Sequence, residues 1–110
     1  MAHFIITLTE KCLRPHVFHD AYEFAAAAGN VAHTVELRIE QSAFALFQTD
    51  TSIDPNPYKA IQGLYFYDVE DIYILQNSLI PQPENFVLPP NVHIVASYPS
   101  VKVDAIEVSF

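Results

Sequence analysis

An alternation of strand-like and helix-like segments is the feature that most narrows what this chain can fold into. The nearly continuous apolar run HFIITLT (3–9) is typical of a strand buried on both faces of a parallel sheet. It is followed by an amphipathic segment, HVFHDAYEFAAAAGN (16–30), and then by HTVELRIE (33–40), in which apolar and polar residues alternate. Because strand, helix and strand in this order form a right-handed crossover between parallel strands, the pattern predicts an α/β fold.

The 16–30 segment is the clearest helix. Pro15 suits the first helical turn, and the pair Gly29-Asn30 suits a helix end. One stripe of apolar residues, spaced by three or four positions, comprises Phe18, Ala21, Ala25 and Ala28. We expect this stripe to pack against the sheet.

The 33–40 segment predicts a strand with two unlike faces. The apolar residues Val35, Leu37 and Ile39 alternate with the polar residues Glu36, Arg38 and Glu40. We expect the polar face to meet water and the strand to lie at an edge of the sheet.

The next part of the chain contains short elements. Segment 41–48 is expected to form a short helix across the end of the preceding strand, and 49–57 is rich in turn residues. Asn56 is suited to cap a helix whose first residue is Pro57. A strand is expected at about 70–75, followed by a turn or short helix.

The last part holds two strands. Four prolines within 81–91 predict a rigid, irregular connection, and strands are expected at 92–97 and 105–110. Together the elements predict one α/β domain, residues 1–110, with a mostly parallel sheet of about five strands. The apolar fraction of 51% is sufficient for a real core, and eight Phe and six Tyr favour a partner interface.

Charge and hydropathy exclude several functions. The chain has 13 acids against five scattered bases, a net charge of −8, so we expect no independent binding to nucleic acids or anionic membranes. No apolar run approaches the ~20 residues that cross a bilayer. The first residues, MAHFIITLTEKC, lack the positive region of a signal peptide, which predicts a cytoplasmic protein.

Three segments together resemble the DsrE/DsrF family of sulfur-relay proteins, and within it the TusC/DsrF branch. They are ELRIEQSAFALF (36–47), YKAIQGLYFYDVEDIYILQNSL (58–79) and DAIEVSF (104–110). The resemblance implies a flavodoxin-like, three-layer α/β domain. It also implies a hetero-oligomer of three related subunits that passes persulfide sulfur between cysteines, in tRNA 2-thiouridine synthesis or in dissimilatory sulfur oxidation.

The resemblance assigns this chain a supporting role. The family's sulfur-carrying cysteine belongs chiefly to the DsrE/TusD-type subunit, and its position falls near Ile74 here. The chain is therefore expected to be a non-catalytic subunit with DsrE/TusD-like and DsrH/TusB-like partners. Two alternatives stay open, namely a sulfurtransferase that uses Cys12 and a self-associating module without a sulfur role.

One departure from the family concerns the last two strands. The family has a helix between them, whereas only YPSVKVD (98–104) separates them here. A parallel crossover generally needs a dozen or more residues. Either the helix is reduced to a turn, or the final strand pairs differently, for example antiparallel.

Cys12 is a candidate thiol that follows the first strand. Lys11, Arg14 and the start of the next helix are positioned to lower its pKa, which would make it nucleophilic. The competing interpretation is an incidental thiol, because Cys12 is not at the family's carrier position.

His16 and His19, with Asp20 and Glu23, have the spacing of one helix flank and are a candidate metal site. The competing interpretation is a solvated helix face or a subunit contact. No serine with a paired base and no glycine-rich phosphate loop is recognisable, so we expect no catalytic serine and no cofactor.

A group of aromatic residues is a candidate interface, comprising Tyr58, Tyr65, Phe66, Tyr67 and Tyr73. Three of these are consecutive, and one element cannot bury three consecutive side chains. At least one ring is therefore expected to face outward or contact a partner, either another subunit or a second copy of the chain.

Overall fold

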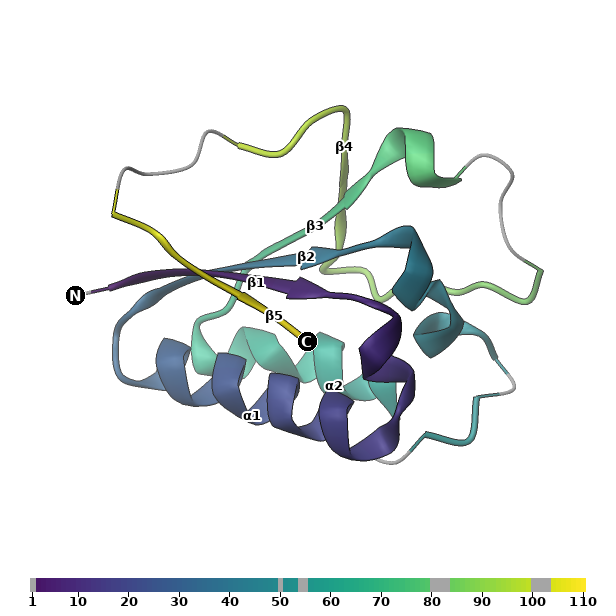
Figure 1. Cartoon of the computed structure of the whole chain (residues 1–110), viewed down its shortest axis with the longest axis horizontal. Coiled ribbons are helices and arrows are strands. Elements are labelled where there is room, and N and C mark those ends of the chain that lie inside the picture. The colour runs from purple at the N-terminus through teal and green to yellow at the C-terminus, as the bar shows by residue number, and fades with distance from the viewer. Residues whose placement is uncertain (1, 50, 54–55, 80–83, 100–103) are drawn as a thin grey trace.

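The structure is a computed structural model that describes residues 2–49, 51–53, 56–79, 84–99 and 104–110. Its five strands are β1 (His3–Leu8), β2 (Thr34–Ile39), β3 (Asp71–Leu75), β4 (His93–Val95) and β5 (Ile106–Ser109). They form a single sheet in the order β4-β3-β2-β1-β5, in which every neighbouring pair is parallel (Figure 1). The expected α/β fold, consistent with a flavodoxin-like domain, is confirmed.

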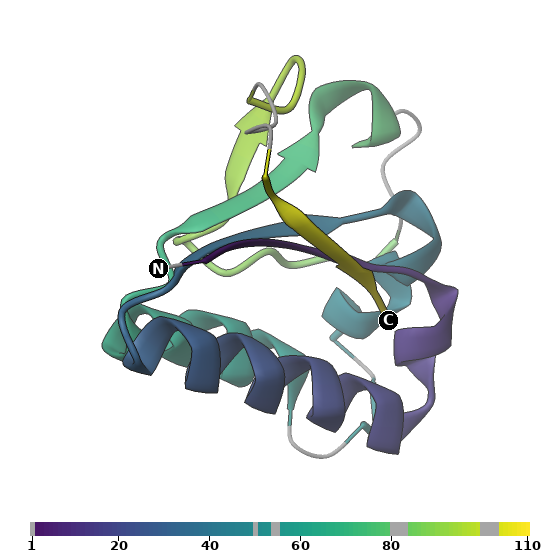
Figure 2. The same ribbon diagram turned by 60° about the vertical axis from the view of Figure 1, so that its left-hand side comes forward.

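Both α-helices cover the same face of the sheet. Helix α1 (Pro15–Asn30) joins β1 to β2, and α2 (Pro57–Gly63) lies between β2 and β3. Because β1, β2 and β3 advance across the sheet in one direction, right-handed crossovers place both helices on one side, as Figures 1 and 2 show. A third layer of helices was expected on the opposite face of the sheet. Among the described residues, the segment around Tyr98 lies on that face and no α-helix does.

The connection from β4 to β5 runs from one edge of the sheet to the other, through positions 96–105. These ten positions are fewer than the dozen or more residues that a parallel crossover with a helix generally needs. A connection of this length is therefore too short for a crossover helix that spans the sheet. The antiparallel alternative is wrong, because β5 pairs parallel with β1, with Phe4 beside Ile106 and Thr7 beside Ser109.

Helix α1 packs closely on the sheet through its predicted stripe. Phe18, Ala21, Ala25 and Ala28 are all buried, and Pro15 occupies the first turn. The helix ends at Asn30 as expected, although the left-handed residue that follows is Ala32 (φ 68°).

Gly29, the residue before the last one of α1, is required because of a close approach and not because of a left-handed backbone conformation. A β-carbon at Gly29 would lie 2.2 Å from the carbonyl oxygen of Tyr67 and 2.8 Å from Cγ2 of Val69. The absence of a side chain therefore lets the last turn of α1 approach the chain that enters β3.

The expectation that the 33–40 strand lies at a sheet edge is wrong. Strand β2 is the middle strand of the five, between β1 and β3. Its polar face is also not open to water, because Glu36 is only 5% exposed. The alternation of apolar and polar residues predicted a solvent-exposed face, but Glu36 and Arg38 form an ion pair on that face and are shielded from water.

The shorter elements follow the sequence closely. Segment 41–48 contains a 3₁₀ helix, η2 (Gln41–Phe47), and the Asn56 side chain caps α2 by accepting a hydrogen bond from the Lys59 amide. Strand β3 leads into η4 (Gln76–Leu79). The other 3₁₀ helices of the described chain are η1 (Glu10–Leu13) and η3 (Leu64–Tyr67).

The proline-rich connection is irregular where the structure describes it, from 84 onward; positions 81–83 lie outside the described residues. Phe86 forms an isolated bridge with Gln48 and stacks against Phe44, with 5.1 Å between the ring centres. The amide of Asn91 donates to the carbonyl of Ile61 in α2 at 2.9 Å. The connection thus fills the helix side of the sheet between η2 and α2, and an α-helix is not needed there.

Replacing Gly29 with alanine should destabilise the fold. The added methyl group would meet a backbone oxygen that cannot rotate away, so we expect a loss of about 1–3 kcal/mol in the free energy of unfolding. The matched control is Gly63→Ala, because no atom lies within 4 Å of a β-carbon there. Urea unfolding followed by circular dichroism measures both, and equal stabilities for the two variants would contradict the proposed close approach.

Candidate functional site

The carboxyl ends of β2 and β3 border a surface hollow of about 360 Å³. Ligands of open parallel sheets commonly bind outside the carboxyl ends of the strands, so this hollow is the first place to look for a site. It is lined by Ile39, Glu40, Gln41, Ser42, Leu75, Ser78 and Tyr98. The sequence analysis did not predict this hollow, because Ser42, Ser78 and Tyr98 come from three separate segments without a shared motif.

The lining of the hollow limits its chemistry. It contains hydroxyl, amide and carboxylate groups but neither histidine nor cysteine. The Ser78 hydroxyl donates a hydrogen bond to the carbonyl of Leu75 at 2.5 Å, so it caps the strand end. An activated serine needs an adjacent base, and this lining presents none apart from carboxylates such as Glu40.

The strand end that would carry a sulfur-relay cysteine presents hydrocarbon. Ile74 is fully buried and belongs to the core on the helix side of the sheet. The residues that follow β3 are Gln76, Asn77 and Ser78, none of which can form a persulfide. No sulfur chemistry is therefore available at this position.

Cys12 lies in η1, directly after β1, and is fully buried. Its Sγ donates a hydrogen bond to the backbone oxygen of Phe110 at 3.3 Å. Burial raises the pKa of the thiol to about 11, and a hydrogen bond from the Thr9 backbone opposes this only weakly. The expected lowering of the pKa by Lys11 and Arg14 is wrong, because both side chains are exposed while the thiol is not.

The end of β5 closes the space around the thiol. The backbone oxygen of Phe110 also accepts hydrogen bonds from the Thr9 amide at 2.7 Å and the Thr9 hydroxyl at 2.8 Å. Access to Cys12 therefore requires that this end of β5 separate from the loop after β1.

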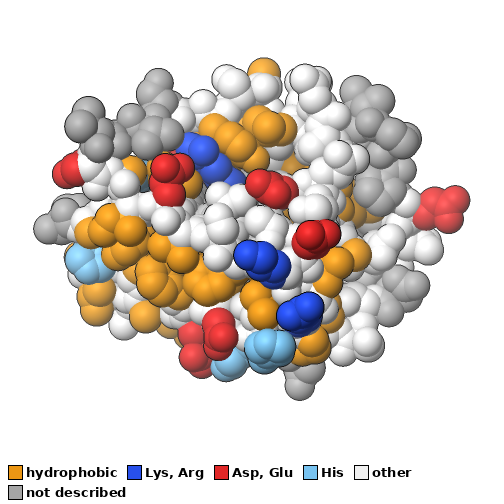
Figure 3. Space-filling view, viewed as in Figure 1, with side chains coloured by type: hydrophobic (Ala, Val, Ile, Leu, Met, Phe, Trp, Pro, Cys, Tyr) orange, Lys and Arg blue, Asp and Glu red, His pale blue; other side chains and the backbone are white. Residues whose placement is uncertain are grey.

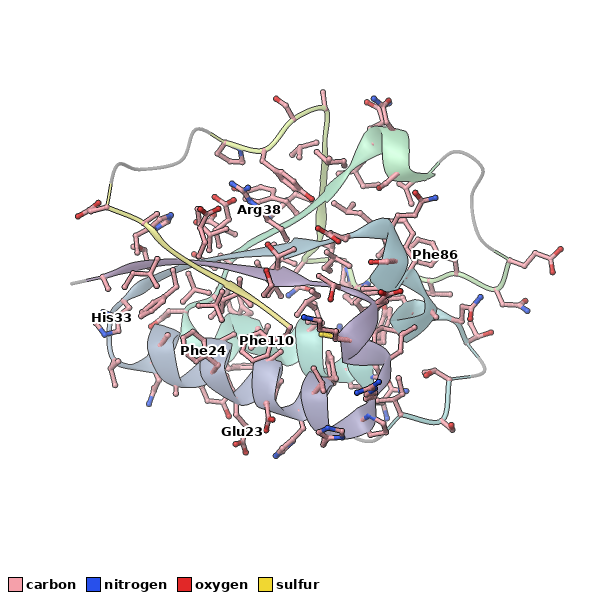
Figure 4. The ribbon with its side chains drawn as sticks, viewed as in Figure 1. Glu23, Phe24, His33, Arg38, Phe86 and Phe110 are labelled. Atoms are coloured by element: carbon pink, nitrogen blue, oxygen red, sulfur yellow. The ribbon has the colours of Figure 1, made fainter. Side chains whose placement is uncertain are left out.

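A buried ion pair occupies the face of the sheet opposite the helices. Arg38 Nε donates to the carboxylate of Glu36, and the two side chains are only 13% and 7% exposed. The ring of Tyr98 covers the guanidinium, with 4.3 Å between Arg38 Cζ and the ring centre. Figure 4 shows Arg38 on the side of the sheet away from α1. Burial raises the pKa of the Tyr98 hydroxyl; Arg38 opposes this rise, and Glu40 and Glu36 add to it.

The two histidine candidates lie on an exposed part of α1. His19 Nε2 lies 3.0 Å from Glu23 Oε1, four residues further along α1, and both side chains are exposed. His16 is exposed at the start of the same helix. Within the described ranges, no group of three or more potential ligands gathers. The arrangement matches a solvated helix face.

The five aromatic candidates do not share one surface. Tyr65, Phe66 and Tyr67 in η3 are 59%, 84% and 37% exposed, so all three consecutive rings reach solvent. Tyr58 is half-buried beside a second hollow, and Tyr73 lies on the polar face of β3 next to His93. We call the exposed η3 residues 65–67 the η3 aromatic surface.

A shallow groove of about 350 Å³ adjoins the η3 aromatic surface. It is lined by Tyr22, Glu23, Ala26, Ala27, Asn30 and Tyr67. Because its lining combines two small alanine side chains with the rings of Tyr22 and Tyr67, the groove can receive an apolar side chain of a partner.

Comparison with known proteins leaves the chain without a family assignment: no protein-family model matches its sequence, and no curated protein matches it. In the part of the chain that the structure describes, no helix is long and apolar enough to cross a membrane.

The raised pKa of Cys12 predicts slow alkylation of the folded protein. At pH 8.5 we expect iodoacetamide to modify the native thiol at least about a hundredfold more slowly than the urea-unfolded thiol, because the thiolate is rare and enclosed. Intact-mass spectrometry follows both rates. Similar rates in the two states would show that the thiol is accessible.

The raised pKa of Cys12 also predicts that the free energy of unfolding depends on pH. The unfolded thiol ionises from its ordinary value of 9.0, whereas the folded thiol stays protonated up to about 11. The folded state therefore binds more protons in this window, and the Cys12 contribution to stability is lost as pH rises through it. Cys12→Ala should lack this component when urea unfolding of the two proteins is compared between pH 8 and 11.

Removing one partner of the buried ion pair should lower the free energy of unfolding more than removing both partners. Glu36→Met leaves the Arg38 charge buried without its partner, and we expect a loss of about 3 kcal/mol in the free energy of unfolding. The double variant Glu36→Met/Arg38→Met should recover most of this loss, because it leaves no unpaired charge. A double variant less stable than Glu36→Met alone would contradict this explanation.

Proposed function

We propose that this chain is a non-catalytic subunit of a cytoplasmic, hetero-oligomeric sulfur-relay complex of the DsrE/DsrF type, in the TusC/DsrF role. Its complex would transfer persulfide sulfur for tRNA 2-thiouridine synthesis or for dissimilatory sulfur oxidation. One observation carries the non-catalytic part: the single cysteine is buried, hydrogen-bonded and has a raised pKa. Ile74 at the expected carrier position supports the same role.

The partners in this proposal are DsrE/TusD-like and DsrH/TusB-like subunits. The η3 aromatic surface and the adjoining groove are suited to contact one of them. Phe66 exposes 84% of its surface, which is costly in water unless a partner covers it. Aromatic anchors of this kind commonly supply much of the binding free energy of an interface.

The alternative of a sulfurtransferase that uses Cys12 has less support. A thiolate must attack a persulfide for transfer to occur, and the thiolate is disfavoured at neutral pH when the pKa is about 11. The thiol is also enclosed by the end of β5.

Co-expression with DsrE-like and DsrH-like proteins encoded beside its own gene tests the proposal. We expect the three chains to co-purify, and Phe66→Ser to reduce recovery of the complex at least about tenfold through loss of an aromatic anchor. Val87→Ser is the matched control, because Val87 is 44% exposed but lies beside η2, away from η3. Purification of the chain alone, with both partners present in the cell, would refute the proposal.

A further inference from the structure

Strand β5 is an edge strand with a defined set of outward backbone groups. The Phe110 amide donates to Thr7 at 2.9 Å, and the Thr9 amide donates to Phe110 at 2.7 Å, so both backbone groups of Phe110 face β1. Backbone direction alternates along a strand, which turns the groups of Ile106 and Val108 toward β1 as well. The N–H and C=O of Glu107 and Ser109 therefore point away from the sheet.

This edge carries part of the usual protection against pairing. Natural edge strands are commonly guarded by shortness, charged side chains, proline or a bulge. Strand β5 is short and contains one charged residue, Glu107, but it contains neither lysine nor proline, and its pairing with β1 has no bulge. No described strand pairs with its outer side.

An apolar group extends from this edge over the helix side of the sheet. We call it the β5 patch, and it consists of Phe4, Phe24, Ile106, Val108 and Phe110. The ring of Phe24 lies 5.3 Å from that of Phe4 and 6.0 Å from that of Phe110. Ile106 is 46% exposed, and the other four are partly exposed. Figure 3 shows hydrophobic side chains gathered on this side of the molecule, and Figure 4 shows Phe24 and Phe110 between α1 and the sheet.

We propose that β5 pairs antiparallel with β5 of a second copy of this chain, across a twofold axis at Val108, so that two sheets become one. A twofold axis closes the assembly at two copies, because each copy uses its β5 edge once. The pairing also brings the two β5 patches together below the joined sheet.

The sequence of β5 is self-complementary in this register. Glu107 of each copy exchanges backbone hydrogen bonds with Ser109 of the other, which are the outward-facing residues. On the helix side, Val108 meets Val108 at the axis and Ile106 meets Phe110, both favourable apolar pairs. On the other side, each Glu107 carboxylate lies opposite a serine hydroxyl.

Other twofold registers are worse. An axis at Glu107 places two carboxylates directly opposite each other, which is destabilising. An axis at Ser109 places Val108 opposite Phe110 and gives up the apolar pair between Ile106 and Phe110. The Val108 register is therefore the best match of backbone and side chains.

The charges near the two ends of β5 differ. Lys11 follows β1 on the side of the carboxyl end of β5, with Glu10 directly before it, and Asp104 precedes the amino end. Antiparallel pairing brings opposite ends together, so Lys11 of one copy lies on the side of Asp104 of the other. This base offsets part of the repulsion between two chains of net charge −8.

The first experiment measures oligomeric state. Light scattering coupled to size exclusion should give a dimer for the purified protein. Ser109→Pro removes an outward N–H without breaking the pairing with β1, and it should weaken the dimer at least about tenfold because two hydrogen bonds are lost per dimer. Ser109→Ala keeps the N–H and should remain a dimer. A monomeric wild-type protein would overturn the proposal.

The second experiment tests the register and does not depend on how Ser109→Pro folds. In a Cys12→Ala background, Val108→Cys places two cysteines opposite each other at the axis, with Cα atoms ~4.5 Å apart. With Ile106→Cys, the two cysteines are offset by four residues along the paired strands, so their Cα atoms lie about 14 Å apart. Under mild oxidation, we expect a disulfide-linked dimer for Val108→Cys only. Equal cross-linking of both variants, or of neither, would overturn this register.

This pairing does not rest on the proposed sulfur-relay role, since it uses neither η3 nor partner subunits. Loss of co-purification with relay partners would leave the β5 dimer intact, and a monomeric protein could still join a relay complex. The two proposals therefore fail independently.

Discussion

The shortness of the connection between β4 and β5 governs most of what is unusual in this molecule. A right-handed return across the whole sheet normally brings a helix onto the second face, and positions 96–105 are too few to supply one that spans it. One consequence follows on that second face: Tyr98, and not a helix, encloses the polar side chains of the middle strand, Glu36 and Arg38.

The same architecture is compatible with the proposed role as a binding subunit. The space at the carboxyl end of β1 is filled by η1 and by the backbone of Phe110, which seals the thiol of Cys12. The carboxyl end of β3 turns Ile74 into the core and contributes Leu75 and Ser78 to the neighbouring hollow. What the molecule does expose is aromatic and aliphatic surface, at η3 and along β5, and exposed apolar surface is stabilised by association.

Local patterns predicted the elements well, and long-range pairings were the source of the errors. The alanine stripe of α1, the Asn56 cap and the short helix after β2 follow from neighbouring residues and are confirmed. The position of β2 in the sheet depends on the strands that flank it, which its own sequence does not reveal. Its polar residues at alternate positions predicted a solvent-exposed face, but a buried ion pair between positions 36 and 38 produces the same alternation. The burial of Cys12 depends on Phe110, at the far end of the sequence, and no local pattern carries that contact.

Persulfide loading tests the central claim most directly, namely that this chain contributes surface and leaves sulfur transfer to its partners. The folded protein and a urea-unfolded sample are each incubated with inorganic polysulfide, which transfers sulfane sulfur to an accessible thiol without an enzyme, and the folded protein is also incubated with a cysteine desulfurase and free cysteine; the intact masses are then compared. We expect no added sulfur on the folded chain and added sulfur on the unfolded one, because only unfolding exposes Cys12. A folded chain that gains one sulfur atom on Cys12 would contradict the claim.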